Sequence, residues 1–265
     1  MVLLLFLTAL GCSLLMLLAW RVQQGTGNST WVDVAWTFGT GLAGIVLTLW
    51  PIGQAGGARG WLVALVAAVW SFRLGSHLIR RALQGRDDPR YAALRESWGE
   101  SYRWKMPGFL QLQALSVFIL GCIIMLAGRN SAPHLGPLDI LALILAALSI
   151  LGEALADEEV RRFASNPANR GRICESGLWG WSRHPNYFCE WLIWVAFALF
   201  ATSGLGSAWS LLAWAGPIVM YLVLVHASGI PPTEAHMLQS RGEAFRDYQR
   251  RVSKFFPLPP KKARS

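Results

Sequence analysis

Polar and ionisable side chains cluster at residues 177–191, directly before a long apolar run. Their types suit ligand binding and proton transfer, because imidazole, phenol and carboxyl groups exchange protons while guanidinium and amide groups form hydrogen bonds. Pro185 fits the first turn of a helix, where its missing N–H costs nothing. A helix that begins there would place Asn186 and Glu190 one turn apart on one face, with Tyr187 beside them. The candidates for ligand contact are Arg183, His184, Asn186, Tyr187 and Glu190.

Several ionisable residues fall within or at the ends of apolar segments, where a charge is costly and needs a partner or a function. Glu190 has no basic neighbour in the sequence, so a functional role is favoured for it over a structural one. Glu153 is a further candidate. For three other acids a structural ion pair is an alternative to a functional role, because neutralising partners lie within reach, either across helices or one turn away on the same helix. These pairs are Asp33 with Arg73, Asp157 with Arg161, and Glu158 with Arg162.

The composition around these residues is that of a membrane protein. Apolar residues make up 54% of the 265 residues and charged residues only 15%, whereas a soluble domain carries about 25% charge. Several apolar runs approach the roughly 20 residues that cross a bilayer as a helix. We expect an all-α polytopic fold with about seven spanning helices, forming one integral-membrane domain over residues 1–265. The expected spans are residues 2–20, 31–50, 61–79, 109–127, 138–156, 187–201 and 208–227.

Charge alternates between the connecting segments. Residues 80–107, 158–184 and 229–265 are rich in Lys and Arg, and the intervening connections are poor in them. Because basic loops stay in the cytoplasm, this pattern places the N-terminus outside and the C-terminus inside. The same bias accounts for the net charge of +9.

The composition also bears on partners. No soluble basic domain is present, so we expect no nucleic-acid partner. The four cysteines and five histidines lack the spacing of metal ligands, so we expect no metal. The apolar spans imply contact with membrane lipids, and we expect a monomer.

The basic tail carries a second pattern. Thr233 is a candidate N-cap for a helix that continues to about Val252. Phe245, Tyr248 and Val252 recur at the helical period, which indicates a packing stripe. We therefore expect a cytoplasmic C-terminal amphipathic helix that docks on the membrane or on the helical bundle.

The run Ser182-Arg183-His184-Pro185-Asn186-Tyr187, followed by Glu190, resembles the membrane reductases of the steroid 5α-reductase and sterol C14-reductase type. It looks closest to a bacterial steroid-reductase-like branch of unknown function. The tail is similar in Gly242-Glu243 with Tyr248 and Val252, and the loop Arg86-Asp87-x-x-Arg90-Tyr91 matches the bacterial branch. The resemblance is strong from about Gly152 to Pro260, and it implies a bacterial inner-membrane protein.

The resemblance implies NADPH as cofactor and reduction of a carbon–carbon double bond conjugated to a carbonyl in a lipophilic substrate. Residues 1–130 would supply the substrate side and residues 138–260 the cofactor side. Its implied catalytic residues are Asp33 as a buried acid donor, Tyr187 as a second donor, and Glu190. Its implied cofactor contacts are Asp157, Arg161, Arg172, Arg183, His184, Asn186, Tyr187, Glu190 and Glu234.

The sequence departs from the steroid enzymes in two places. Asp33 stands where those enzymes carry a Gln-Glu pair, and Trp70 where they carry a substrate-side Tyr. These departures leave the substrate open, whether steroid-like, sterol-like or isoprenoid.

Two other functions are compatible with the same residues. Isoprenylcysteine carboxyl methyltransferases share the Arg-His-Pro core and a similar tail but bind S-adenosylmethionine; a phospholipid methyltransferase belongs to the same alternative. Asn186-Tyr187 with Glu190 favours the reductases. The third hypothesis is a lipid- or sterol-binding membrane protein without enzymatic activity.

Overall fold

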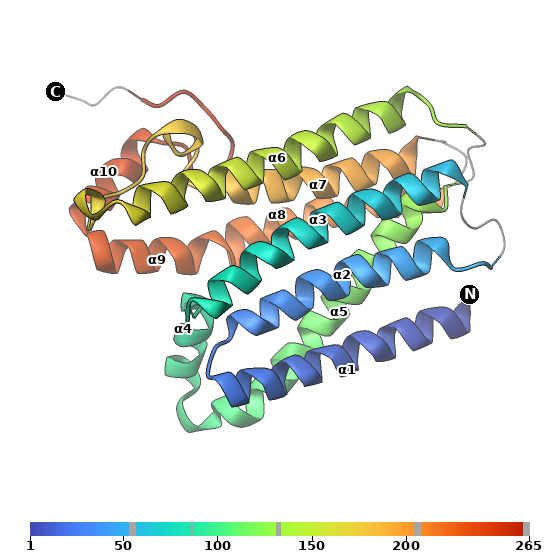
Figure 1. The fold of residues 1–265 in the computed structure, drawn as a ribbon, viewed down its shortest axis with the longest axis horizontal. Coiled ribbons are helices and arrows are strands. Elements are labelled where there is room, and N and C mark those ends of the chain that lie inside the picture. The colour runs from blue at the N-terminus through green and yellow to red at the C-terminus, as the bar shows by residue number, and fades with distance from the viewer. Residues whose placement is uncertain (53–56, 86, 131–133, 204–207, 262–265) are drawn as a thin grey trace. The chain divides into compact units, whose positions relative to one another are not determined.

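The computed structural model describes residues 1–52, 57–85, 87–130, 134–203 and 208–261, and Figure 1 shows their helices in chain order. The regular secondary structure over these residues is helical, apart from one isolated bridge between Ser182 and Ser253. The all-α expectation is thereby confirmed for the described part of the chain.

Six helical segments among the described residues are long and apolar enough to cross a membrane, so the chain is a multi-pass membrane protein. Helix α7 (Pro185–Thr202), the sixth expected span, is not among them. Asn186 and Glu190 in its first turns lower its hydropathy, and the count of seven stays a prediction. The six segments are α1 (Val2–Thr26), α2 (Thr30–Leu49), α3 (Ala58–Leu83), the stretch Arg90–Gly128 that contains α5 (Tyr102–Gly128), α6 (Pro137–Ser165), and Trp209–Arg241.

The chain divides into two compact units. Unit 1 comprises Met1–Leu143 with Ala196–Gly216, and unit 2 comprises Ile144–Val195 with Pro217–Ser265. The boundaries fall inside α6, α7 and α8 (Ala215–Leu222), so each of these helices contributes residues to both units. The expected change from a substrate side to a cofactor side, between residues 130 and 138, stays a prediction.

Unit 1 is a bundle in which α2 packs against α1, α3 and α5 (Figure 1). Small residues allow the backbones to approach: a Cβ on Gly44 would lie 2.6 Å from the Cδ1 of Ile124. Spanning helices commonly associate this way, because lipid offers no hydrophobic driving force between them. The indole of Trp36 adds a hydrogen bond to the Ser116 hydroxyl at 2.8 Å.

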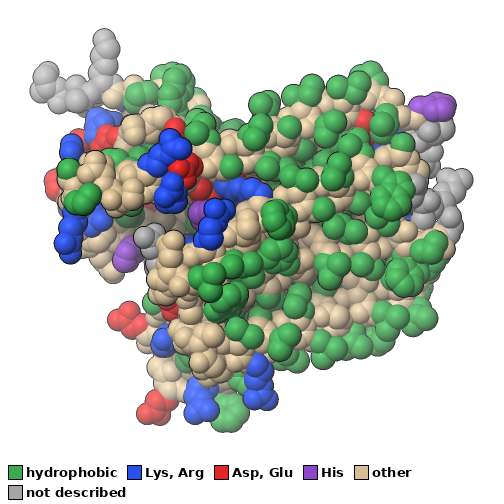
Figure 2. All heavy atoms as spheres, in the orientation of Figure 1, with side chains coloured by type: hydrophobic (Ala, Val, Ile, Leu, Met, Phe, Trp, Pro, Cys, Tyr) green, Lys and Arg blue, Asp and Glu red, His purple; other side chains and the backbone are tan. Residues whose placement is uncertain are grey.

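The surface of unit 1 matches its membrane setting. Figure 2 shows hydrophobic side chains over the visible faces of its long helices, and charged side chains gathered at the end that carries α4 (Pro89–Trp98). Phe6, Trp61 and Phe72 are each more than half exposed, at 63%, 64% and 70%. Large exposed apolar surface of this kind is typical of a face that contacts membrane lipid or another protein.

Both long polar segments are more helical than expected. Residues 80–107 are not a loop: α3 continues to Leu83, α4 follows, and α5 begins at Tyr102. Asp88 caps α4 by accepting a hydrogen bond from the Arg90 N–H at 2.9 Å, and Pro89 occupies the first turn. In the second segment, α6 continues to Ser165 before two 3₁₀ turns.

The expected single tail helix from Thr233 to Val252 is wrong. The structure has two helices, α9 (Ile230–Arg241) and α10 (Glu243–Arg251), and Gly242 breaks them apart with a φ of 54°. Thr233 lies inside α9 instead of capping it, and its hydroxyl donates to the Gly229 carbonyl at 2.9 Å. The apolar stripe is a packing stripe, as predicted: Phe245, Tyr248 and Val252 are buried together against Ile173, Met237 and Leu238.

The tail helices follow an irregular bend. Helix α8 (Ala215–Leu222) runs into a π-helical turn over Val223–Ala227. Gly229 ends this bend because a Cβ there would overlap the Leu224 backbone. The chain changes from apolar α8 to polar α9 at this bend.

Candidate functional site

The last described residues of the chain hold the segment 177–191 in place within unit 2. The hydroxyl of Ser182 donates to the Phe255 carbonyl at 2.8 Å. The backbone N–H of Arg183 donates to the Ser253 carbonyl, also at 2.8 Å. The tail therefore runs beside the segment and fixes its backbone just before α7 begins.

The side chain of Arg183 is almost fully engaged by the tail. It is 8% exposed, and its Nε donates to the Glu234 carboxylate at 2.8 Å. One terminal nitrogen donates to the carbonyls of Gln249 and Val252, at 3.1 Å and 2.6 Å. A buried guanidinium is tolerated when a carboxylate and several acceptors surround it in this way.

Glu234 collects two further contacts. His184 Nε2 lies 3.1 Å from the carboxylate oxygen that Arg183 also contacts. The side-chain amide of Gln249 donates to the other oxygen at 2.7 Å. We call Arg183, His184, Glu234 and Gln249 the Glu234 network. Three of its members were predicted as cofactor contacts; the structure brings those three together, and the contacts described here are with the protein itself.

His184 is held in a form that resists protonation. Burial lowers the pKa of His184 below its usual value of 6.5. The Glu234 carboxylate opposes this shift, while Arg183 and Lys254 reinforce it. The net effect is that the folded protein binds a proton at His184 less readily than the unfolded chain does.

Acid is therefore expected to destabilise the protein through His184. Between the lowered pKa and 6.5 the unfolded chain binds more protons, so the free energy of unfolding falls as pH falls. From about pH 7.5 to about 5.5 the slope should approach but not exceed about 1.4 kcal/mol per pH unit. Thermal unfolding in detergent across this range measures it. His184→Gln should flatten the profile and His236→Gln, at an exposed position, should not; equal profiles in all three proteins would contradict the assignment.

Asn186 presents an unsatisfied acceptor. Its Nδ2 donates to the Asp157 carboxylate at 3.5 Å, which joins the first turn of α7 to α6. Its Oδ1 is buried and has no hydrogen-bond donor among the described residues. A buried carbonyl oxygen without a donor costs about 1–3 kcal/mol, so the Oδ1 of Asn186 is an acceptor open to a further hydrogen bond.

Tyr187 contacts His184 of the Glu234 network and Thr233 of α9. Its ring stacks on the His184 imidazole, with centroids 5.5 Å apart and an interplanar angle of 6°. Its hydroxyl lies 3.5 Å from the Thr233 hydroxyl, at the limit of a hydrogen bond. The stacked ring fixes the position of a phenol group that is only weakly bonded.

Glu190 has a structural partner that sequence reasoning overlooked. It is 6% exposed and accepts a hydrogen bond from the Trp194 indole at 3.0 Å. The spacing of four residues could have revealed this contact. Close helix packing surrounds it, since a Cβ on Gly152 of α6 would lie 2.8 Å from the Cys189 sulfur.

The remaining predicted cationic contacts lie at the surface of unit 2. Arg161 pairs with Glu158 at 2.6 Å and is 63% exposed, so its expected pairing with Asp157 is wrong. Glu158 also pairs with Arg162, which confirms that prediction. Arg172 is exposed. Both predicted cofactor arginines, Arg161 and Arg172, can therefore reach a soluble ligand.

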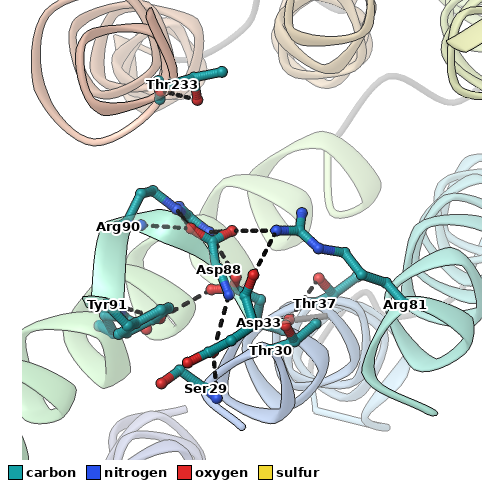
Figure 3. Close-up of polar contacts among 12 residues, drawn as sticks. Ser29, Thr30, Asp33, Thr37, Arg81, Asp88, Arg90, Tyr91 and Thr233 are labelled. Atoms are coloured by element: carbon teal, nitrogen blue, oxygen red, sulfur yellow. Dashed lines mark hydrogen bonds and ion pairs between the residues drawn. The ribbon is translucent and has the colours of Figure 1, made fainter. Parts of the chain in front are cut away.

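Unit 1 holds a separate polar cluster around Asp33, near the start of α2 (Figure 3). Its carboxylate pairs with Arg90 at 2.6 Å and accepts a hydrogen bond from the Tyr91 hydroxyl at 2.9 Å. Sequence reasoning paired Asp33 with Arg73, whereas the ion pair in the structure comes from α4. The loop that resembled the bacterial branch thus supplies both contacts.

Asp88 is the residue of this cluster that sequence reasoning missed. Besides capping α4, it pairs with the side chains of Arg90 at 2.8 Å and Arg81 at 3.2 Å. Burial raises the pKa of Asp88, but the two guanidinium groups outweigh burial and hold it below its ordinary value. The signal was present in the sequence, because Asp followed by Pro is typical of an N-cap and first helical turn.

Metal ligands are not grouped in the part of the chain that the structure describes. No set of three or more His, Cys, Asp or Glu side chains there could hold a metal ion. The thiols of Cys12, Cys122 and Cys174 form no disulfide bond.

Comparison with known proteins places the chain in a family. The family model described as "Protein of unknown function (DUF1295)" matches residues 19–252. An uncharacterized protein of Schizosaccharomyces pombe (strain 972) is 29% identical over 269 residues, which cover 90% of this chain and 75% of that relative. No solved structure matches the chain. Because the family model spans most of the sequence, including the Asp33 cluster and the Glu234 network, the chain belongs to the DUF1295 family.

Proposed function

We propose that the protein is an NADPH-dependent reductase of a carbon–carbon double bond conjugated to a carbonyl group in a lipophilic substrate. The observation that carries the proposal is the buried Oδ1 of Asn186, which lacks a donor among the described residues. A nicotinamide carboxamide offers the N–H that this oxygen requires. The resemblance of residues 182–190 to the steroid 5α-reductase type supports the same reading.

The residues present fit this cofactor. Asn186 would accept from the carboxamide, and Glu190, one turn later on the same face, would accept a second hydrogen bond. Exposed Arg161 and Arg172 would bind its phosphates, for which guanidinium groups are well suited. When bound, NADPH would supply a hydride to the β-carbon of the conjugated system.

Tyr187 is the proton donor in this proposal. Reduction of the double bond needs a hydrogen bond to the carbonyl oxygen as negative charge develops there, and a proton to complete the product. The Tyr187 phenol is fixed by stacking on His184 and only weakly bonded to Thr233. Asp33 suits the role less well than the sequence suggested, because its carboxyl oxygens are already engaged by the ion pair with Arg90 and by the hydrogen bond from Tyr91.

The proposal includes the setting of the reaction. A lipophilic substrate would enter from the membrane, and the protein would act as a monomer in a bacterial inner membrane. The alternation of basic segments supports an N-terminus outside and a C-terminus in the cytoplasm, where NADPH is available. A fluorescent-protein fusion at the C-terminus should fold and fluoresce; a dark fusion alongside an active periplasmic reporter would contradict this orientation.

NADPH binding to the purified protein in detergent tests the proposal. The wild type should bind NADPH, and Asn186→Ala should weaken binding about 10- to 100-fold, because one hydrogen bond to a buried group is lost. Asn166→Ala is the matched control, since Asn166 is an exposed amide in the same unit. A wild type that ignores NADPH and binds S-adenosylmethionine would instead favour a membrane methyltransferase.

A further inference from the structure

The C-terminal segment forms a cationic pocket that the proposed reaction does not use. The pocket has a volume of about 280 Å³ and is lined by residues of α10 and of the chain that follows it, together with Arg183. Its cationic lining residues are Arg183, Arg250, Arg251, Lys254 and Lys261, and the described lining contains no Asp or Glu. Since liquid water occupies about 30 Å³ per molecule, the pocket has room for a hydrated phosphate group.

The arginines and lysines of the pocket differ in how far they are neutralised. Arg250 and Arg251 pair with Asp247, and Arg251 also pairs with Glu175. Arg183 is matched by Glu234. The lysines form no ion pair with a described carboxylate: Lys254 donates one hydrogen bond, to the Val225 carbonyl at 3.2 Å, and keeps two further donors. Lys254 and Lys261 are both exposed, so the excess positive charge of the pocket resides on them.

Apolar side chains border the same pocket. Leu258 lines it and is 55% exposed, and Trp181, whose carbonyl accepts from the Leu258 N–H at 3.0 Å, is 50% exposed. Phe256 is 46% exposed and packs edge-on against Trp191 of α7, with centroids 5.9 Å apart. The ring of Phe256 also stacks on Tyr221 of α8, which belongs to an apolar spanning segment.

The positively charged pocket is thus bordered by three exposed apolar side chains, those of Trp181, Phe256 and Leu258, which we call the apolar rim. The rim lies beside α7 and α8. Basic side chains next to aromatic and aliphatic ones are the combination that binds a bilayer surface, because the apolar groups enter the headgroup boundary while the cations meet lipid phosphates. A soluble anion would need only the charge and would gain nothing from the rim.

We propose that this pocket binds the phosphate of an anionic phospholipid headgroup, with Lys254 and Lys261 as its principal contacts and Trp181, Phe256 and Leu258 inserted beside the lipid. The site would anchor the tail to the membrane surface. It lies in unit 2 and shares only Arg183 with the residues assigned to the cofactor, so it stands whether or not the protein is a reductase.

Native mass spectrometry of the full-length protein, titrated in detergent with phosphatidylglycerol or phosphatidylcholine, tests the proposal. The wild type should bind phosphatidylglycerol more tightly than phosphatidylcholine. The double variant Lys254→Gln/Lys261→Gln should bind phosphatidylglycerol about tenfold more weakly, since each surface cation adds severalfold to the affinity for anionic lipid. Arg103→Gln/Lys105→Gln removes the same charge from exposed positions of α5 and should leave the affinity unchanged.

Two results would overturn the proposal. One is equal affinity for phosphatidylglycerol in the wild type and in the Lys254/Lys261 variant, given unchanged thermal unfolding of both. The other is displacement of the lipid by inorganic phosphate at the lipid's own concentration, which would identify a site for a free anion. Loss of NADPH binding would affect neither outcome.

Discussion

Replacing Glu234 with Gln is expected to lower the free energy of unfolding by about 3 kcal/mol, because a buried guanidinium that loses its counter-charge costs about 3–5 kcal/mol. Arg183 is 8% exposed and its ion pair with Glu234 spans only 2.8 Å. A glutamine would keep the size of the side chain, but its amide would present N–H donors to Gln249, which itself donates to that carboxylate. The loss of stability therefore has two causes: Arg183 loses its counter-charge, and the amide donors of the introduced glutamine and of Gln249 oppose each other.

Thermal unfolding in detergent measures this effect, and limited proteolysis after residue 241 reports whether the tail has detached. Glu243→Gln is the control: Glu243 is 66% exposed and pairs with Arg246 and Arg250 at the surface. Exposed pairs of this kind contribute little, so the control should unfold like the wild type. A Glu234→Gln protein as stable and as protease-resistant as Glu243→Gln would show that the network does not hold the tail.

Replacing Tyr187 with Phe should reduce turnover about 100-fold while leaving NADPH affinity unchanged. The change removes only the hydroxyl, and the loss of one donor to a developing oxyanion typically costs about 100- to 1,000-fold. The ring would still stack on His184, so the local fold should persist. Oxidation of NADPH in the presence of lipophilic enones, measured at saturating and at limiting substrate, separates the effect on kcat from that on KM.

Tyr221→Phe provides the comparison, because Tyr221 belongs to the neighbouring aromatic cluster with Phe255 and Phe256. It should retain wild-type turnover. Should Tyr187→Phe turn over as fast as Tyr221→Phe, the proton must come from another residue, and the Asp33 cluster would be the next to vary.

Composition, helix-start residues and helical periodicity predicted much of the secondary structure around the site. Pro185 at a change from polar to apolar residues marks the start of α7, and the structure begins the helix there. The sparse charge and the apolar runs predicted a helical multi-pass protein. The spacing of Phe245, Tyr248 and Val252 predicted that this face would be buried.

The contacts that complete the site are not local, and the sequence could not supply them. Arg183 and Glu234 are 51 residues apart, and several other acids were equally available to that guanidinium before the fold was known. Arg90 pairs with Asp33 across 57 residues, whereas Arg73 seemed to be the partner because both residues fall in apolar runs. The break at Gly242 was also missed, because helix-forming residues continue on both sides of it.

The attachment of Arg183 to the tail imposes an order of events during biosynthesis. Arg183 donates to the Val252 carbonyl, 69 residues later in the chain. At about 5–20 residues per second the ribosome needs roughly 3–14 seconds to make that stretch. During this interval the guanidinium of Arg183, two residues before the start of α7, lacks its carbonyl acceptors because they have not yet been synthesised. We therefore expect α7 to insert into the membrane before Arg183 can bind the tail. Until residues 249–252 have been synthesised, the Arg183 side chain must be solvated by water at the membrane surface.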